Sequence, residues 1–208
     1  MLYIVKKILR LFDVHDAIYD DAYYAKDVAG PAEQAAPHVA ASIAAHFQPK
    51  RLIDVGCGTG AMLDAARTLG IDVMGLEYAS AAIKICNQRG LPVLRFNIEQ
   101  DNLPIITPAD VVLSTEVAEH LPGRCADRYV ALLCHLGSVI MLTAAPPGQG
   151  GTDHVNTQPK SYWIGKFAAR GRTYDEEHTS AIADEWKSRG VAFFYHNNLM
   201  VFQRASGS

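Results

Sequence analysis

The stretch LIDVGCGTGAMLDAA, residues 52–66, constrains the fold more than any other part of the chain. An apolar run ends directly in a cluster of glycines, and a helical pattern of apolar residues follows. Gly56, Gly58 and Gly60 let the backbone turn tightly and approach a ligand closely. A strand, a glycine turn and a helix in this order predict the first half of a βαβ unit, with a ligand site at the helix N-terminus.

Segments typical of strands and helices alternate through the first two thirds of the chain, which predicts a parallel sheet. The predicted strands are 51–55, 72–77, 92–98, 109–115 and 137–144, and the helices between and after them include 61–70, 80–90, 161–171 and 180–190. In residues 191–204, two β-rich runs flank Asn197-Asn198 as in a hairpin. We therefore expect an α/β fold with a doubly wound, mostly parallel seven-stranded sheet that ends in an antiparallel hairpin.

Residues 1–45 are predicted to form an N-terminal helical extension or lid, and residues 46–205 the main domain. The opening MLYIVKKILRLF places Ile4, Ile8 and Leu11 on one helix face, which predicts an amphipathic helix that packs on the domain or on a second copy in a homodimer. Contact of this helix with a membrane surface is the alternative. The apolar run is too short and too often interrupted by charge for a transmembrane helix.

Charge and cysteine content narrow the possible environments. The net charge is −3 and no basic stripe is present, which argues against nucleic acid as a partner. The four cysteines form no C-x-x-C pair, so we expect free thiols in a reducing, cytoplasmic compartment.

Glu77 ends the second predicted strand about 20 residues after the glycine loop, where a carboxylate can accept hydrogen bonds from both hydroxyls of a ribose. Loop and carboxylate together predict a nucleoside-containing cofactor. The same letters fit the dinucleotide pattern G-x-G-x-x-A with Ala61, so a short NAD(P)-dependent oxidoreductase is the alternative. Asp54 disfavours it, because a carboxylate before the glycines suits a cationic ligand and repels a pyrophosphate. The chain is also too short to add a separate substrate domain.

Over residues 50–145, the stretches LIDVGCGTG, GLEYA, FNIEQ and VVLSTEVAEHLP resemble the class I S-adenosylmethionine-dependent methyltransferases, which have a Rossmann-like fold. The resemblance implies that S-adenosylmethionine is the cofactor. It further implies that Asp54 and the loop glycines surround the methionine part and that Glu77 binds the ribose. The remaining expected cofactor contacts are Tyr78, Asn97, Ile98, Thr115 and Glu116. Asn97 stands where the family usually has Asp, and plain core packing stays open for Tyr78 and Ile98.

The segment STEVAEHLP spaces Glu116, Glu119 and His120 at i, i+3 and i+4, so one helical turn would point all three side chains the same way. Loops after neighbouring strands meet at one crevice of a doubly wound sheet, which lets His154 approach them. We therefore expect that these four residues can hold a divalent cation, with Mn²⁺, Fe²⁺, Co²⁺ or Zn²⁺ better suited than Mg²⁺. The run locally resembles the metal site of the small-RNA 3′-terminal 2′-O-methyltransferases.

Two other interpretations of this segment stay open. His120 or His154 can act as a general base, with Glu119 as a further catalytic residue, because imidazole titrates near neutral pH. The residues can also be purely structural, because E-x-x-E-H occurs in many class I methyltransferases with no known metal. Trp163 and Phe167, at i and i+4, are expected to face the core.

The family resemblance implies methyl transfer to a small-molecule acceptor. The loop HVNTQPKSYW mixes polar and aromatic residues, which favours a hydroxyl of sugar or natural-product type. Tyr23 and Tyr24 belong either to a lid over the cofactor or to ordinary packing. A non-catalytic cofactor-binding partner subunit is the remaining alternative.

Overall fold

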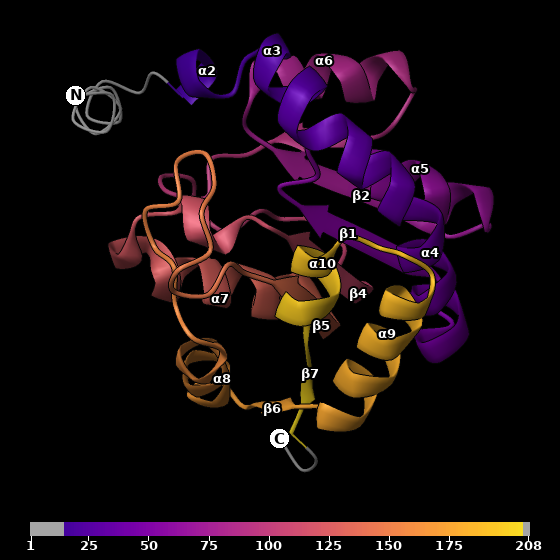
Figure 1. The fold of residues 1–208 in the computed structure, drawn as a ribbon, viewed down its shortest axis with the longest axis vertical. Coiled ribbons are helices and arrows are strands. Elements are labelled where there is room, and N and C mark those ends of the chain that lie inside the picture. The colour runs from indigo at the N-terminus through magenta and orange to yellow at the C-terminus, as the bar shows by residue number, and fades with distance from the viewer. Residues whose placement is uncertain (1–14, 206–208) are drawn as a thin grey trace.

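A seven-stranded sheet with the order β3-β2-β1-β4-β5-β7-β6 forms the centre of the computed structural model, which describes residues 15–205 (Figure 1). The strands are β1 Arg51–Val55, β2 Asp72–Glu77, β3 Val93–Arg95, β4 Ala109–Thr115, β5 Gly137–Thr143, β6 Arg172–Tyr174 and β7 Met200–Arg204. Strands β1 to β5 are parallel, and β7 is antiparallel to both β5 and β6. The predicted α/β class and the mostly parallel sheet with an antiparallel end are confirmed.

Helices cover both faces of the sheet. They are α4 Ala29–Phe47, α5 Ala61–Thr68, α6 Ser80–Gln88, α7 Ala126–Leu136, α8 Lys160–Ala168, α9 Glu176–Ser188 and α10 Phe193–Asn198. Helices α4, α5 and α9 pack on one face and α7 and α8 on the other (Figure 1). Trp163 and Phe167 on α8 are almost completely buried in the second layer, as predicted.

The sequence predicts the turn of the antiparallel pair at Asn197-Asn198, and this position is wrong, because the segment forms helix α10. The antiparallel neighbours of β7 are instead β5 and the short strand β6, and α9 and α10 lie between β6 and β7 in the chain. Tertiary contacts override the β propensity of the aromatic residues. Tyr195 is buried against the core, and the buried Asn198 side chain donates hydrogen bonds to Glu116 and Gln149.

Strand β3 is shorter than the predicted 92–98, because Asn97 starts a turn. Its side-chain oxygen accepts a hydrogen bond from the backbone N–H of Glu99 at 2.8 Å, and its backbone carbonyl accepts from Asp101 at 2.9 Å. The other parallel strands begin and end within a residue of the predicted bounds. The carboxyl ends of β1 and β4, between which the strand order reverses, therefore lie where expected.

The N-terminal segment reaches the carboxyl end of the sheet through α2 His15–Ile18, α3 Asp21–Tyr23 and a π-helical turn at Tyr24–Val28. Asp16 binds it to α6 by accepting hydrogen bonds from the backbone and hydroxyl of Ser80. The division predicted at residue 45 stays a prediction. Helix α4 crosses it, and its Val39 and Ile43 belong to the core that also contains β1.

Four further predictions concern the N-terminal helix, a homodimer contact, the cysteines and membrane-spanning segments. The amphipathic helix at 1–12 and a homodimer contact through it lie outside the described residues. All four cysteines are free thiols, as predicted. Within residues 15–205, no helix has the length and hydropathy needed to cross a membrane.

Candidate active site

A pocket of about 460 Å³ opens at the carboxyl ends of β1, β2 and β4, a volume typical of small-molecule sites. Most of the predicted site residues line it: Asp54, Gly56, Gly58, Glu77, Tyr78, Asn97, Ile98, Thr115, Glu116, His120 and His154. Gly60 and Glu119 do not. Gly60 caps α5 at a φ of 77°, and Glu119 is fully buried behind the pocket wall.

The glycine loop lines the pocket, and its residues Gly56 and Gly58 have a left-handed backbone conformation. Gly56 and Gly58 have φ values of 74° and 53°, which L side chains rarely adopt. A Cβ atom on Gly56 would lie 2.5 Å from the Val117 side chain. Backbone conformation and close packing therefore both require glycine here, as the sequence pattern indicated.

Glu77 is held at the end of β2 by backbone N–H groups. Its carboxylate accepts hydrogen bonds from Gly58 at 2.8 Å, Tyr78 at 2.7 Å and Ala79 at 2.9 Å. Burial raises the pKa of Glu77, and these three hydrogen bonds oppose the rise. Because two carboxylate oxygens offer about four acceptor sites, the group keeps capacity for a ligand hydroxyl.

Asp54 places a buried carboxyl group at the pocket. Both of its oxygens are buried, and neither has a hydrogen-bond partner among the described residues. Burial raises the pKa of Asp54 to about 8, and the negative charge of Glu77 adds to the rise. A buried acceptor of this kind fits a ligand that brings a positive charge, such as the sulfonium and amino groups of S-adenosylmethionine.

Tyr78, Asn97 and Ile98 line the pocket on the side of Glu77. The Arg95 guanidinium lies 5.0 Å from the centroid of the Tyr78 ring, and the His15 ring packs against it edge-on. The side-chain oxygen of Asn97 already accepts one hydrogen bond within its turn, which leaves one lone pair for a ligand amino group.

Glu116 adopts a left-handed backbone, with a φ of 53°, directly after β4. The helical turn expected over the three residues of STEVAEHLP is therefore wrong for Glu116, because only Ala118–His120 is helical. Its backbone N–H donates to Thr143, and its carboxylate accepts from Asn198 and Gln149, each at 3.3 Å. A strained non-glycine residue lining a pocket is common at functional sites.

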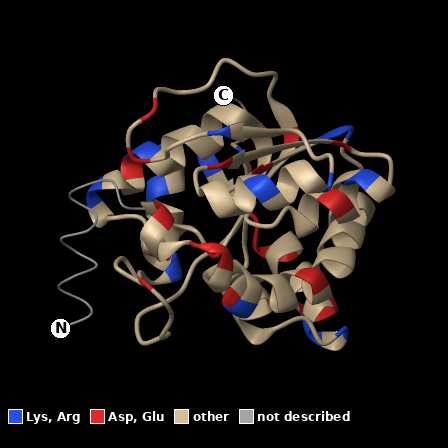
Figure 2. Ribbon diagram, turned by 90° about the horizontal axis from the view of Figure 1, so that it is seen from above, with Lys and Arg blue, Asp and Glu red and all other residues tan. Residues whose placement is uncertain are grey.

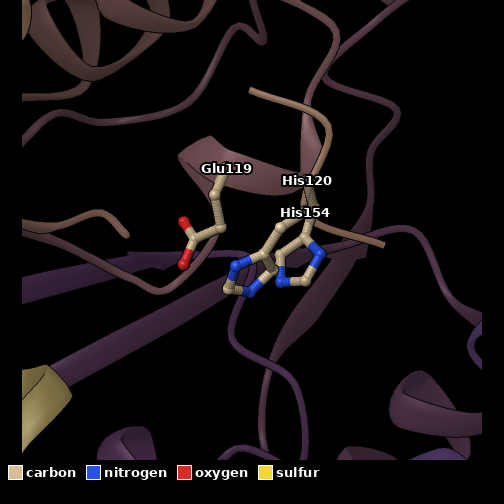
Figure 3. A group of neighbouring side chains, drawn as sticks. All are labelled: Glu119, His120 and His154. Carbon is tan, nitrogen blue, oxygen red and sulfur yellow. The ribbon is translucent and has the colours of Figure 1, made fainter. Parts of the chain in front are cut away.

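Glu119, His120 and His154 do converge (Figure 3). Each offers one ligand atom, and these atoms lie within 4.8 Å of one another, so three of the four predicted metal ligands form one group and Glu116 lies outside it. Neither carboxylate oxygen of Glu119 accepts a hydrogen bond of good geometry in the described part of the chain. The backbone groups of Ala145 and of Glu119 itself and the carboxylate of Glu116 are nevertheless close enough to influence its pKa. Burial, with the charge of Glu116 next, raises the pKa of Glu119 well above its ordinary range. The donor set fits a divalent cation that accepts nitrogen and oxygen ligands.

Several residues of the site were not predicted from the sequence. Tyr19 is almost fully buried, and its hydroxyl lies 3.3 Å from Nδ1 of His120 and donates to Asp153 at 3.1 Å. Phe194 and Tyr195 reach the pocket from α10. Tyr23 and Tyr24, for which a lid was one of two interpretations, line the pocket as well. No local pattern identifies Tyr19, which lies about 100 residues from His120 in the sequence.

The pocket lies where the strand order reverses, in a sheet with an antiparallel end. Its glycine loop, Glu77 and Asp54 together indicate an enzyme of the methyltransferase type, which binds a cofactor that contains a nucleoside. The sequence matches the family described as methyltransferase domain over residues 24–137, more than half of the chain, and the chain belongs to this family of class I S-adenosylmethionine-dependent methyltransferases.

Curated relatives share part of the chain. The ubiquinone biosynthesis O-methyltransferase of Bordetella avium is 30% identical over 142 residues, which are 64% of this chain and 52% of that protein. The protein of the same name from Cereibacter sphaeroides is 31% identical over 150 residues, 62% of this chain and 53% of that protein. The chain thus spans about half the length of these relatives.

Solved structures with the same fold cover nearly the whole chain. S-adenosylmethionine-bound CalS10, an amino pentose methyltransferase from Micromonospora echinaspora, is 20% identical with a TM-score of 0.63, covering 88% of this chain and 95% of that one. S-adenosylmethionine-bound magnesium protoporphyrin IX methyltransferase from Synechocystis is 17% identical with a TM-score of 0.64, covering 98% and 96%. At these identities the likeness shows the fold.

Proposed function

We propose that the protein transfers a methyl group from S-adenosylmethionine to a hydroxyl oxygen of a small acceptor that carries no negative charge near the reacting atom. The observation that carries the proposal is the continuity of the pocket, which joins Asp54 and Glu77 to His120 and His154 in one cavity. The O-methyltransferase relatives support oxygen as the accepting atom.

In the proposal, one part of the pocket binds the cofactor and the other binds the acceptor. Asp54 then faces the cationic methionine part, Glu77 accepts a hydrogen bond from a ribose hydroxyl, and Tyr78, Asn97 and Ile98 enclose the adenine. The acceptor is proposed to lie beside His120 and His154, close to Tyr19 and Tyr23. Tyr24 instead lies near Gly58 of the glycine loop. S-adenosylmethionine supplies an electrophilic methyl group, and the chain contributes mainly by holding the acceptor oxygen close to it and aligned.

The charges around the pocket support a neutral or cationic acceptor. Over the described chain, basic and acidic positions are interspersed (Figure 2). The pocket itself is lined by the acidic residues Asp27, Asp54, Glu77, Glu99 and Glu116, and no Lys or Arg of residues 15–205 lines it. Asp54 is not counted as a repelling charge, because it holds a proton below about pH 8 in the free protein and would face the cofactor's positive charge when ionised. A phosphate or carboxylate on the acceptor would enter this field without a cationic partner, which is costly in a partly desolvated site.

Glu119, His120 and His154 are proposed to hold a divalent cation beside the acceptor. Both oxygens of Glu119 are buried without a hydrogen bond of good geometry, and burial raises the pKa of this group. A cation would offset the cost of ionising it there, which supports this role over a purely structural one. A metal there would supply Lewis acidity that lowers the pKa of the acceptor hydroxyl. Without metal, His120 or His154 remains the candidate general base, since both line the pocket.

The test is turnover with methyl-labelled S-adenosylmethionine and matched acceptors. Neutral polyhydroxy and phenolic compounds are compared with their phosphorylated or carboxylated analogues, with and without chelator. We expect labelled methyl ethers only from the uncharged members, and loss of turnover after chelation that Mn²⁺ or Zn²⁺ restores. Preferred methylation of the anionic analogues would contradict the acceptor class. Cofactor binding without turnover, whatever the acceptor, would support the non-catalytic partner subunit instead.

A further inference from the structure

Tyr19 connects three segments that are far apart in the sequence. Its hydroxyl lies between Nδ1 of His120, in the turn after β4, and the carboxylate of Asp153, in the loop after β5. The Tyr19 ring is fixed on both sides, because the His15 ring lies 4.4 Å away and the Tyr23 ring packs against it edge-on at 5.1 Å. The N-terminal segment thus contributes the Tyr19 hydroxyl to the site, between His120 and Asp153.

The direction of these hydrogen bonds follows from proton counting. A tyrosine hydroxyl has one proton, and Tyr19 donates it to Oδ2 of Asp153. The contact between the Tyr19 oxygen and Nδ1 of His120 can then be a hydrogen bond only if Nδ1 carries the proton. This protonation leaves the lone pair of a neutral imidazole on Nε2.

His154 has the same arrangement. Its Nδ1 lies 3.2 Å from the backbone carbonyl oxygen of Gln149. A carbonyl oxygen only accepts, so Nδ1 of His154 is the donor and Nε2 carries the lone pair. Figure 3 shows one ring nitrogen of His120 on the side of His154 and the other on the far side. Because Nδ1 faces Tyr19, the nitrogen on the side of His154 is Nε2.

We propose that Tyr19 and Asp153 are positioning residues that hold His120 as its Nδ1–H tautomer and present its Nε2 lone pair to the group with Glu119 and His154. The inference deepens the proposed function, on which its consequence for catalysis rests. A histidine that ligates a metal or accepts a proton is commonly oriented by a partner on its other nitrogen. Asp153 has a left-handed backbone with a φ of 59°, which aspartate adopts more readily than most residues, and its carboxylate accepts the hydrogen bond from Tyr19.

Tyr19 lies before residues 24–137, which match the family. The orienting hydroxyl of the site is therefore contributed by a segment outside the matched domain. Removal of this hydroxyl should affect the tautomer of His120 and the rate of methyl transfer, and leave the binding of the cofactor at Glu77 and Asp54 unchanged.

The experiment is tautomer analysis by long-range proton–nitrogen correlation spectra of ¹⁵N-histidine-labelled full chain, freed of metal with EDTA. The spectra are recorded at about pH 8, where ordinary imidazoles are neutral. The His120→Gln variant identifies the His120 signals. We expect a protonated Nδ1 and an unprotonated Nε2 in the wild type, and loss of that preference in Tyr19→Phe and Asp153→Ala. Tyr23→Phe, which removes a neighbouring hydroxyl, should leave the His120 tautomer unchanged.

A His120 signal with its proton on Nε2 in the wild type would overturn the inference, and this result needs no variant to fold. An unchanged tautomer in a folded Tyr19→Phe protein would overturn it as well. Under the proposed function, Tyr19→Phe should also lower kcat by about 10- to 100-fold at unchanged S-adenosylhomocysteine affinity. If the wild type binds no S-adenosylhomocysteine but shows the expected tautomers, the proposed function fails while the assignment of Tyr19 stands.

Discussion

Asp54 and Glu77 are buried carboxylates at the ends of neighbouring parallel strands, and the charge of Glu77 helps to raise the pKa of Asp54 to about 8. The two differ in their partners. Glu77 accepts three backbone hydrogen bonds, whereas the oxygens of Asp54 have no partner in the described chain. Asp54 is therefore the carboxylate that gains most from a cationic ligand, and its ionisation should be linked to cofactor binding.

The affinity for S-adenosylmethionine should rise with pH toward about 8. Below that pH the free protein holds a proton on Asp54, which the cationic ligand must displace, so each pH unit costs up to about tenfold in Kd. Above it, the affinity should level off. Calorimetric titrations from about pH 6 to about pH 9 measure this dependence.

The matched variant for that titration is Asp54→Asn, which cannot ionise. It should bind more weakly at high pH and lose the rise that is specific to the wild type. Titration of the ligand's own amino group affects both proteins equally and cancels in the comparison. Parallel pH profiles for the two proteins would show that Asp54 does not face the positive charge.

The free energy of unfolding of the cofactor-free protein should also depend on the ionisation of Asp54, and it should fall as the pH rises. The folded pKa of Asp54 is about 8, above the unfolded value of about 3.9, so the native state binds the proton more tightly. Rising pH between these values therefore removes stability, fully so above about pH 8. Asp54→Asn should be more stable than the wild type, by a margin that grows with pH.

Urea unfolding at about pH 6 and about pH 8.5, without cofactor, measures that margin. Asp72→Asn, at the exposed beginning of β2 where Asp72 pairs with Arg51, is the control and should change stability by less than about 1 kcal/mol. An equal margin for Asp54→Asn at the two pH values would contradict the raised pKa.

Gly151→Ala should disturb the group of possible metal ligands without touching the cofactor end of the pocket. A Cβ atom on Gly151 would lie 2.2 Å from Nε2 of His154, so the imidazole ring must move. We expect Mn²⁺ or Zn²⁺ affinity to fall at least about tenfold, and S-adenosylhomocysteine affinity to stay unchanged. Gly150→Ala is the neighbouring control, because a Cβ there meets nothing within 4 Å. Equal metal affinity in both variants would remove His154 from the proposed ligands.

Glu119→Gln should separate the metal interpretation from the structural one. If Glu119 binds a cation, the variant loses metal affinity and becomes more stable without metal, because a neutral amide replaces a buried carboxylate. Metal titration followed by urea unfolding measures both. A wild-type protein that binds no cation, together with a Glu119→Gln variant that is less stable than the wild type, would favour the structural interpretation.

The sequence predicts the part of the fold that local patterns determine. Strands β1, β2 and β4 have the predicted bounds, because each is an apolar run that ends at a glycine loop or a polar site residue. The β-rich composition of residues 191–204 predicts a hairpin where the structure has helix α10. Strand propensity does not reveal that Tyr195 lines the pocket or that Asn198 donates a hydrogen bond to Glu116, which lines it.

The candidate site shows the same limit. The glycine loop, Glu77 and Asp54 follow from residue type and spacing. The left-handed conformation of Glu116 does not, because helical spacing presumes a regular backbone that this residue lacks. Tyr19 and Asp153 meet His120 only through the tertiary fold, and no spacing rule relates residues that far apart.

The central claim is that the cleft above the glycine loop binds S-adenosylmethionine through Asp54 and Glu77. Calorimetric titration of S-adenosylhomocysteine and, separately, NADH into the wild type and Glu77→Ala tests it most directly. The account predicts one S-adenosylhomocysteine site per chain in the wild type, much weaker binding in Glu77→Ala, and no NADH binding to either. A folded wild-type protein that binds NADH and gives no response to S-adenosylhomocysteine would contradict it.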